Sequence, residues 1–295
     1  MVDNKGTISQ ERSFLNSGRF RWVGWSRFGR VRIVSVNAWG GAMFDELAPW
    51  VESCGADVLC LQEVPRTPGL RGWTRFDDAE RSLPQRADLL ADVGSRLPRH
   101  QPLFAVSDSG PVQDEEGGAH RQDFGVATFV AETLPVVGLR SAFVHGGYAE
   151  HHDGWPAGDR PRAALAVRVF DRPARRFVTV VNLHGLRDAG GKADTPARRA
   201  QAERLAALVA GAREDGDLTV VCGDLNLLPG SETFRILAGL GLRDLVGDAD
   251  TRTSRYRKPV RHASYLLVSD PAAVKEFEVA AAPEVSDHRA LILDL

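Results

Sequence analysis

The stretch Val220-Val-Cys-Gly-Asp-Leu-Asn226 joins the end of an apolar strand to two polar residues two positions apart. Successive side chains of a strand point to opposite faces, so Asp224 and Asn226 face the same way. Such a pair can take a proton with one group while the other orients a substrate oxygen. A turn in which aspartate ends the strand fits the pattern equally well, and these seven residues alone do not separate the two interpretations.

Four more segments place polar side chains at the boundaries of apolar, β-branched runs. They are Ser35-Val-Asn37, Leu61-Gln-Glu63, Asn182-Leu-His184 and Val285-Ser-Asp-His288. A carboxylate at such a position suits Mg²⁺, which prefers oxygen ligands. The Asp-His pair suits phosphoryl binding or acid–base chemistry. Each segment alone is also compatible with a surface turn, but together they predict polar side chains that converge on one rim of a sheet.

The rest of the chain alternates strand and helix patterns. Strands are predicted at 32–37, 57–63, 125–130, 163–170, 177–183, 218–222, 265–268 and 290–295. Helices are predicted at 44–54, 85–97, 195–210 and 231–237, with Thr195 as the N-cap of the third. Segments 64–85, 105–123 and 145–155 are predicted to be long loops because they are rich in Gly, Pro and charged or polar residues.

The composition is that of an ordinary folded protein. Of 295 residues, 43% are hydrophobic and 26% are charged, and the net charge is −2, which excludes a polycation and an acidic disordered tail. No apolar run reaches the roughly 20 residues that span a bilayer. Three cysteines cannot form a disulfide framework. Because no secretory signal pattern opens the chain, we expect a cytoplasmic protein, and we expect a monomer.

Charge divides the chain into two parts. Residues 1–30 hold six Lys or Arg against two Asp or Glu and lack periodicity, which predicts an extension outside the fold. A basic arm that touches nucleic acid or a partner is the alternative, because this segment also contains aromatic residues. Residues 31–295 have an acidic balance and no linker, so we expect a single domain there. An acidic body is a poor non-specific binder of nucleic acid.

Taken in order, the motifs carry a family resemblance. They are Ser-Val-Asn ending at 37, Leu-Gln-Glu ending at 63, Gly-Val-Ala at 125–127, Asn-Leu-His at 182–184, Gly-Asp-Leu-Asn at 223–226 and Ser-Asp-His at 286–288. In these motifs the sequence resembles the endonuclease/exonuclease/phosphatase superfamily, which has the DNase I-like fold, over residues 31–295. The resemblance implies an α/β protein, a four-layer α/β sandwich of two packed mixed β-sheets flanked by helices. It also implies phosphoester hydrolysis dependent on Mg²⁺ or Mn²⁺.

The resemblance implies a role for each motif residue. Glu63 would be the principal metal ligand, with Asn37 beside it and Asp287 at or near the metal. Asp224 would activate water or protonate the leaving group, and Asn226 would orient the phosphate and the nucleophile.

The remaining motif residues are implied to act on the phosphate. His288 would stabilise phosphoryl oxygens or handle a proton, and His184 occupies the position of a general-acid histidine. Arg162 is the better match to a phosphate-contacting arginine, with Arg160 as the alternative, and Asn182 is assigned to phosphate binding. These donors suit phosphoryl transfer, which depends mainly on positioning and charge stabilisation.

One position departs from the family pattern. The family places an aspartate before the tyrosine of the penultimate strand, where it bonds the final histidine, and this sequence has Ser264 before Tyr265. A serine brings no charge, so we expect His288 to act as a neutral donor with a less elevated pKa. A catalytically weakened member with a binding or regulatory role is the alternative that this departure suggests.

Two basic features remain after the motifs. Residues 251–261 hold five basic residues and no acid, and Lys192, Arg198 and Arg199 follow His184. They are either solvated or in contact with non-reacting phosphates of a substrate. Trp39 either stacks on a substrate or packs internally.

We therefore expect a divalent-metal-dependent phosphodiester hydrolase, with a nuclease as the first candidate. A phosphoesterase for a small molecule, nucleotide or lipid head group is the alternative.

Overall fold

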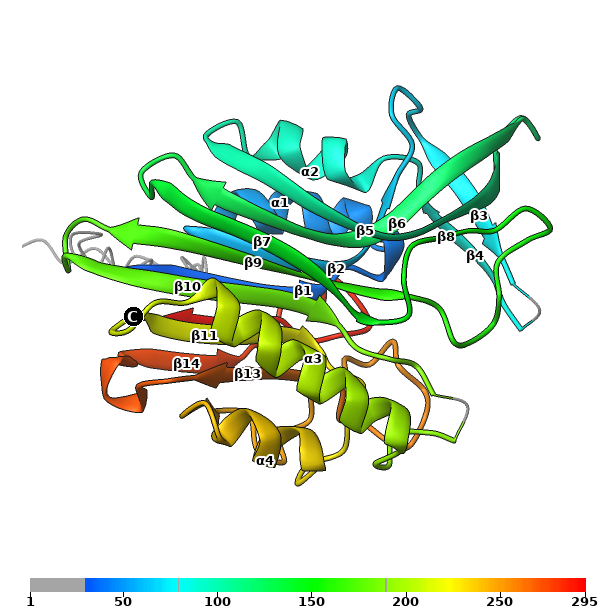
Figure 1. Cartoon of the computed structure of the whole chain (residues 1–295). Helices are drawn as coiled ribbons and strands as arrows, with labels where there is room; N and C mark the ends of the chain where they lie inside the picture. Colours follow the sequence, from blue (N-terminus) through cyan, green and yellow to red (C-terminus); the bar gives the residue numbers. More distant parts are fainter. Residues whose placement is uncertain (1–29, 79, 189) are drawn as a thin grey trace, which may run out of the picture.

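Two mixed β-sheets pack face to face between two pairs of helices in the computed structural model, which describes residues 30–78, 80–188 and 190–295 (Figure 1). The four-layer α/β sandwich that the motifs implied is confirmed. Nearly all of the expected N-terminal extension, residues 1–30, lies outside the described part of the chain. No helix of the described segments is long and apolar enough to cross a membrane.

The first sheet has the strand order β14-β15-β1-β2-β6-β5-β3-β4, with β8 beside β5. Its strands are β1 (Arg32–Asn37), β2 (Val58–Arg66), β3 (Trp73–Asp77), β4 (Ser82–Arg86), β5 (His100–Asp114), β6 (Ala119–Ala131), β8 (Ala149–Glu150), β14 (Glu276–Val279) and β15 (Leu291–Asp294). Helices α1 (Phe44–Ser53) and α2 (Leu89–Arg96) cover its outer face. Their buried residues Leu47 and Val93 belong to one apolar cluster with Val36 and Leu59.

The second sheet has the order β12-β13-β11-β10-β9-β7. Its strands are β7 (Val136–His145), β9 (Arg162–Asp171), β10 (Arg176–His184), β11 (Leu218–Asp224), β12 (Arg243–Asp244) and β13 (Ser264–Val268). Helices α3 (Pro196–Ala212) and α4 (Glu232–Ala238) cover this sheet, and short 3-10 helices lie at Trp39–Gly41 and Pro271–Ala273. As predicted, Thr195 caps α3, where its hydroxyl accepts the Arg198 N–H.

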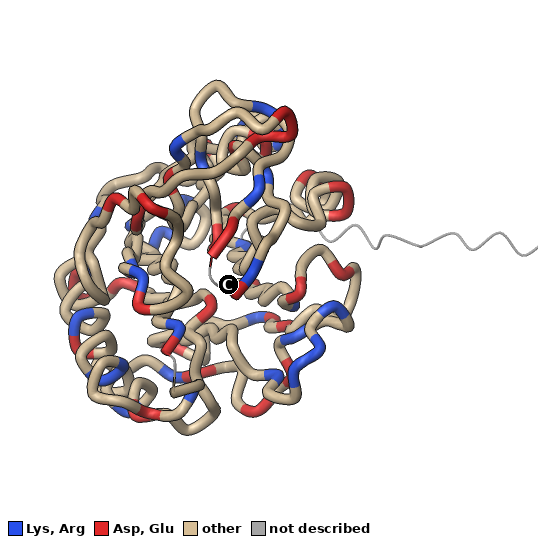
Figure 2. The backbone as a smooth tube through the Cα atoms, turned by 90° about the vertical axis from the view of Figure 1, so that its right-hand side faces the viewer, with Lys and Arg blue, Asp and Glu red and all other residues tan. Residues whose placement is uncertain are grey.

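Strand register brings the motif residues to one edge of the sandwich. In parallel pairs, Asn37 of β1 lies opposite Gln62 of β2, and His184 of β10 lies opposite Asp224 of β11. In the antiparallel pair of β11 with β13, Asp224 lies opposite Ser264. These strand ends point to the right-hand side of Figure 1, which faces the viewer in Figure 2.

Gly223 permits the close approach of β10 and β11 at this edge. Its φ is +143°, and a Cβ there would lie 2.0 Å from the carbonyl oxygen of Leu183. Because the clash is with backbone, only glycine fits between the two motif strands.

The structure corrects two expected loops and adds a strand that was not predicted. Residues 64–85 contain the end of β2, the hairpin strand β3 and part of β4, whereas 105–123 contain most of β5 and the start of β6. Residues 136–145 form β7, which the sequence analysis did not predict. These strands carry polar residues on exposed faces, so apolar alternation is weak. Phe76 of β3, Val112 of β5 and Phe124 of β6 form a small buried cluster with Trp155, which lies outside the strands.

Candidate active site

A pocket of about 840 Å³ opens at the edge where the motif strands end. Its lining includes most of the predicted site, namely Glu63, Arg162, His184, Asp224, Asn226, Asp287 and His288. Trp39 and Tyr256 contribute aromatic surface, and Phe76 on β3 adds a wall from the corrected hairpin region. The pocket therefore combines residues from both sheets and from several loops.

Two carboxylates and an amide form the floor of the pocket. The Asn37 side-chain amide donates to Glu63 Oε1 and to Asp224 Oδ2, both at 3.0 Å. Asn37 Oδ1 in turn accepts the backbone N–H of Trp39 at 2.9 Å. Asn37 and Asp224 are almost fully buried, whereas Glu63 is partly exposed. Asn37 thus holds the two carboxylates side by side.

Unusual backbone conformations orient the side chains of Glu63 and Asn226. Glu63 and Asn226 have φ values of +54°, in the left-handed region that non-glycine residues rarely adopt. At Glu63 the ladder between β2 and β6 also shifts its register, as at a β-bulge. At Asn226, the backbone N–H donates to Asp224 Oδ1 at 3.0 Å and fixes the turn. Strained backbone of this kind is common at functional sites.

His184 lies against both carboxylates. Its Nε2 is 3.8 Å from Glu63 Oε1 and 3.8 Å from Asp224 Oδ2. Burial and the nearby Arg162 guanidinium lower the pKa of His184 to about 4, although the two carboxylates oppose this effect. The imidazole is therefore neutral at pH 7, so it can offer a lone pair but is a poor general acid.

The donor set fits a divalent cation. Ligand atoms of Glu63, His184 and Asp224 all lie within 4.8 Å of one another. Among the described residues, no Lys or Arg forms an ion pair with Glu63 or Asp224. Burial by itself would raise the pKa of Asp224, but His288, His184 and nearby cations lower it, so the group is ionised. Adjacent carboxylates without a paired side-chain cation, beside a neutral imidazole, suit a hard divalent ion.

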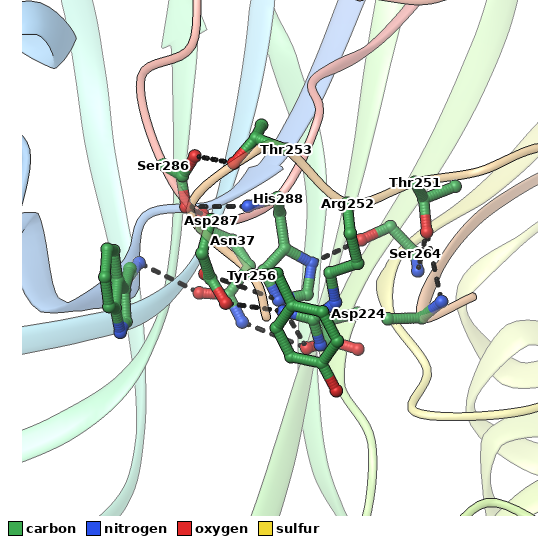
Figure 3. Close-up of polar contacts among 12 residues, drawn as sticks. Asn37, Asp224, Thr251, Arg252, Thr253, Tyr256, Ser264, Ser286, Asp287 and His288 are labelled. Carbon is green, nitrogen blue, oxygen red and sulfur yellow. Dashed lines mark hydrogen bonds and ion pairs between the residues drawn. The ribbon is translucent and has the colours of Figure 1, made fainter. Parts of the chain in front are cut away.

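Asp287 does not belong to this compact group of three. Its Oδ2 accepts from Arg252 Nη1 at 2.7 Å, and the Arg252 guanidinium stacks on the Tyr256 ring at 4.0 Å (Figure 3). Burial, together with Glu63 and Asp224, raises the pKa of Asp287 to about 7 against the opposing charge of Arg252. Asp287 thus lies near the cluster of Glu63, His184 and Asp224, but it pairs with Arg252, which was expected only as part of a basic segment.

The two candidate arginines have different surroundings. Arg160 makes a bidentate ion pair with Asp108, at 2.7 and 2.8 Å, and its guanidinium lies 4.4 Å from the ring centre of Trp155. Arg162 is 6% exposed and lines the pocket, and its Nε has no hydrogen-bond partner among the residues that the structure describes. Burial and the neighbouring Arg160 lower its pKa to about 10, which still leaves the guanidinium charged at pH 7. Arg162 is thus the arginine with free capacity for an anion.

Asn182 lies away from the pocket and ties the two sheets together. Its Oδ1 accepts from Gln62 Nε2 at 2.8 Å. Its amide donates to Ala127 O at 2.8 Å and also contacts Leu61 O and Thr128 Oγ1. The side chain is fully buried and does not line the pocket. The sequence-based assignment of Asn182 to phosphate binding therefore does not fit this geometry.

Ser264 contacts the final histidine, as the sequence comparison with the family pattern implied. Its Oγ lies 2.9 Å from His288 Nδ1, and both residues are buried (Figure 3). His288 Nε2 lies 3.4 Å from Asp224 Oδ2. Burial and the charge of Arg252 hold the pKa of His288 well below its usual value, so the imidazole is neutral at pH 7.

Ser264→Asp is expected to change the pH dependence of turnover. A carboxylate at the position of Ser264 Oγ would favour the protonated His288 and raise its pKa. The acid limb of the plot of log kcat against pH should then move to higher pH, while the neutral variant Ser264→Ala should leave this limb in place. An active Ser264→Asp variant with the wild-type pH profile would contradict the proposed neutral role of His288.

The family model described as "Endonuclease/Exonuclease/phosphatase family" matches residues 34–288. Among curated protein sequences, none matches this chain.

Several solved structures share the fold at low sequence identity. An endonuclease/exonuclease/phosphatase from Bacteroides vulgatus is 17% identical, with a TM-score of 0.60 and coverage of 90% of this chain and 98% of its own. The Bacteroides thetaiotaomicron mannosyl-6-phosphatase is 16% identical, with a TM-score of 0.59 over 89% and 98% of the two chains. Zebrafish (D. rerio) TDP2, solved with a single-strand DNA product, is 13% identical, with a TM-score of 0.56 over 90% and 98%.

The neighbours below 25% identity establish the fold, and the family model covers most of the chain. The motif order, the strand register and the pocket agree with that match. The chain belongs to the endonuclease/exonuclease/phosphatase family.

Proposed function

We propose that this protein is a divalent-metal-dependent phosphoester hydrolase that uses water as the nucleophile. The observation that carries the proposal is the arrangement of Glu63, His184 and Asp224 around one point, with the charged Arg162 in the same pocket. This arrangement places a cation site beside an anion site, as hydrolysis of a phosphoester requires. Membership of the family supports the reaction class.

Glu63, Asp224 and His184 would hold the metal, which is Mg²⁺ or Mn²⁺ in this proposal. Such an ion polarises the phosphorus–oxygen bond and lowers the pKa of bound water. Because both carboxylates are positioned by Asn37, that residue sets the spacing of the ligands. Asp287 lies nearby, and its pairing with Arg252 keeps it oriented.

The protein's own groups position the reactants. Asp224 accepts a hydrogen bond from the attacking water and orients it, because a carboxylate with a lowered pKa is a weak proton acceptor but a good hydrogen-bond acceptor. Arg162 donates to the phosphoryl oxygens on which negative charge develops. His288 and Asn226 supply neutral donors at the same wall. The bond between the water oxygen and phosphorus forms as the bond between phosphorus and the ester oxygen breaks. The attacking water releases a proton to solvent, and the leaving oxygen takes up a proton from solvent.

The volume of the pocket and the charges around it favour a small phosphoester as the substrate. Its volume of about 840 Å³ lies within the range of small-molecule sites. The edge of the molecule that faces the viewer in Figure 2 intermixes basic and acidic residues instead of presenting one broad basic face. Several basic residues of segment 251–261 also have acidic partners, which reduces their capacity for phosphates along a strand. A nuclease, which the sequence analysis ranked first, is therefore the second candidate.

A substrate panel with Mn²⁺ tests the proposal. The panel contains bis-p-nitrophenyl phosphate, p-nitrophenyl phosphate, and single- and double-stranded DNA and RNA. We expect release of p-nitrophenol at a rate that exceeds cleavage of any nucleic acid. Faster cleavage of nucleic acid would favour the nuclease, and absence of turnover on every substrate would favour a weakened member with a binding role.

A further inference from the structure

The cations that line the pocket fall into two groups. One group has carboxylate partners: Arg81 pairs with Asp78, Arg160 with Asp108, Arg187 with Glu80 and Arg252 with Asp287. The other group has no carboxylate partner among the described residues and consists of Arg162, Lys192, Arg198 and Lys258. Unpaired cations in a pocket provide free capacity for anions, and a single phosphodiester carries one negative charge, which Arg162 and a metal already address.

Lys192 is held at the pocket by its own hydrogen bond and by contacts that order the neighbouring backbone. Its Nζ donates to the carbonyl oxygen of His262 at 2.5 Å, so it faces segment 251–263. Arg198, which is 1% exposed, donates to the carbonyl oxygens of Ala193 at 2.7 Å and Leu186 at 3.3 Å. Arg198 thereby orders the backbone on both sides of Lys192, and within the described part of the chain its own Nε has no partner.

Lys258 comes to the same pocket from segment 251–263. Three other basic residues of this segment are engaged elsewhere, since Arg252 pairs with Asp287, Arg255 with Glu284 and Arg261 with Asp250. Arg257 is exposed and does not line the pocket. Lys258 lines it and has no acidic partner among the described residues. Lys258 is itself exposed, so the segment contributes one solvent-accessible ammonium group to the pocket that Lys192 also lines.

We propose that Lys192 and Lys258 bind a second phosphate group of the substrate, distinct from the phosphoryl group that is hydrolysed. The preferred substrate is then a phosphoester that carries a further phosphate. This inference rests on the proposed function, because it assigns the substrate class of the same pocket.

Lysine chemistry and the state of Lys192 support this assignment. An ammonium group is a compact point charge that binds phosphate without requiring a bidentate geometry. Burial lowers the pKa of Lys192 to about 8, against the opposing effect of Asp224, so the group is largely charged at pH 7. A partly buried cation with only a carbonyl partner gains more from an anion than a solvated one does.

A binding experiment tests the second site without turnover. Isothermal titration calorimetry measures the Kd of thymidine 3′,5′-bisphosphate and of thymidine 5′-phosphate, in EDTA and separately with Ca²⁺. We expect the wild-type protein to bind the bisphosphate more tightly. Lys192→Gln should weaken bisphosphate binding by about 10- to 100-fold, as expected for loss of a charge-assisted hydrogen bond. Binding of the monophosphate should change by less than about 3-fold.

Two matched variants complete the binding experiment. Lys258→Gln should weaken bisphosphate binding in the same direction as Lys192→Gln. Arg257→Gln removes the same charge from the adjacent residue, whose side chain does not line the pocket, and should leave both Kd values unchanged. Equal affinity of the wild-type protein for the two nucleotides would overturn the proposal, and so would an unchanged preference in Lys192→Gln.

A kinetic arm separates this proposal from the proposed function. Thymidine 3′-phosphate 5′-(p-nitrophenyl phosphate) and thymidine 5′-(p-nitrophenyl phosphate) differ only in the 3′-phosphate. With Mn²⁺, kcat/KM should favour the first ester in the wild-type protein, and Lys192→Gln should abolish that preference. Absence of p-nitrophenol from both esters would refute the hydrolase, while the calorimetry would still decide the second site.

A final arm identifies the source of the second phosphate. Single-stranded oligothymidylate carries neighbouring phosphates along a chain, whereas the bisphosphate carries them on one small molecule. We expect the bisphosphate to compete for turnover more strongly than the oligonucleotide, because the pocket has the volume of a small-molecule site. Stronger competition by the oligonucleotide would overturn the small-molecule source and assign the second phosphate to a strand.

Discussion

Asp224→Asn is expected to lower kcat for bis-p-nitrophenyl phosphate by about 10³-fold, the upper end of the loss caused by removing one preorganised electrostatic group, because Asp224 offers a metal-ligand atom and orients the attacking water. The substitution keeps the shape of the side chain but removes the charge that lies 3.0 Å from the Asn37 amide and 3.4 Å from His288 Nε2. An amide at this position also presents a donor to the Asn37 donor, so orientation of the water is lost together with charge. Steady-state kinetics with saturating Mn²⁺ measures the effect.

Asp188→Asn is the matched control for this variant. Asp188 also lines the pocket, but its carboxylate accepts from the Gly190 N–H and the Thr195 hydroxyl, at 2.8 and 3.0 Å. We expect kcat within about 3-fold of the wild-type value for the control, since it removes a surface charge of modest effect. Circular dichroism and thermal unfolding establish that both variants fold. A folded Asp224→Asn variant with wild-type kcat would refute the role of Asp224.

Glu63→Gln is expected to weaken metal activation by about 100-fold or more. Loss of partners that only orient metal ligands already costs 10- to 100-fold in affinity or activity, and Glu63 itself offers a ligand atom. The neutral amide keeps the size of the side chain but leaves Asp224 as the one carboxylate of the three-residue cluster. The Mn²⁺ concentration that gives half-maximal turnover measures the change.

Glu80→Gln is the control for metal activation, because Glu80 lines the same pocket but pairs with Arg187 at 2.8 Å. This control should have the wild-type dependence on Mn²⁺. A Glu63→Gln variant that also shows this dependence would remove Glu63 from the metal site.

The site was predictable from sequence where strand register alone determines position. Asn37, His184 and Asp224 are the last residues of β1, β10 and β11, and the parallel pairing of these strands with their neighbours brings their ends to one edge. A polar residue at the end of a buried strand therefore indicates the rim of the sheet. The buried strands were also predictable, because their apolar runs are continuous.

Side-chain partners across the fold were not predictable in this way. Asn182 lies two residues before His184 and so shares its strand face by period, yet its amide is consumed by Gln62 and by backbone of β2 and β6 in the sheet interface. The pair of Arg252 with Asp287 joins residues 35 positions apart, and no local pattern indicates it.

The choice between two arginines shows the same limit. Arg160 and Arg162 stand two positions apart, and the family pattern favours Arg162 without excluding Arg160. The position of Asp108 on β5 is what gives them different surroundings. Asp108 neutralises Arg160 and leaves Arg162 without an acidic partner among the described residues. The part of β5 that supplies Asp108 lies within residues 105–123, which were predicted to be a loop because their polar face hides the strand period.

Metal dependence of the wild-type protein is the most direct test of the proposed hydrolase. The protein is dialysed against EDTA and then against metal-free buffer, and hydrolysis of bis-p-nitrophenyl phosphate is followed before and after addition of Mn²⁺ or Mg²⁺. The arrangement of Glu63, His184 and Asp224 predicts no turnover without metal and recovery of turnover when either ion is added. Undiminished turnover in EDTA, or no turnover with either ion, would contradict it.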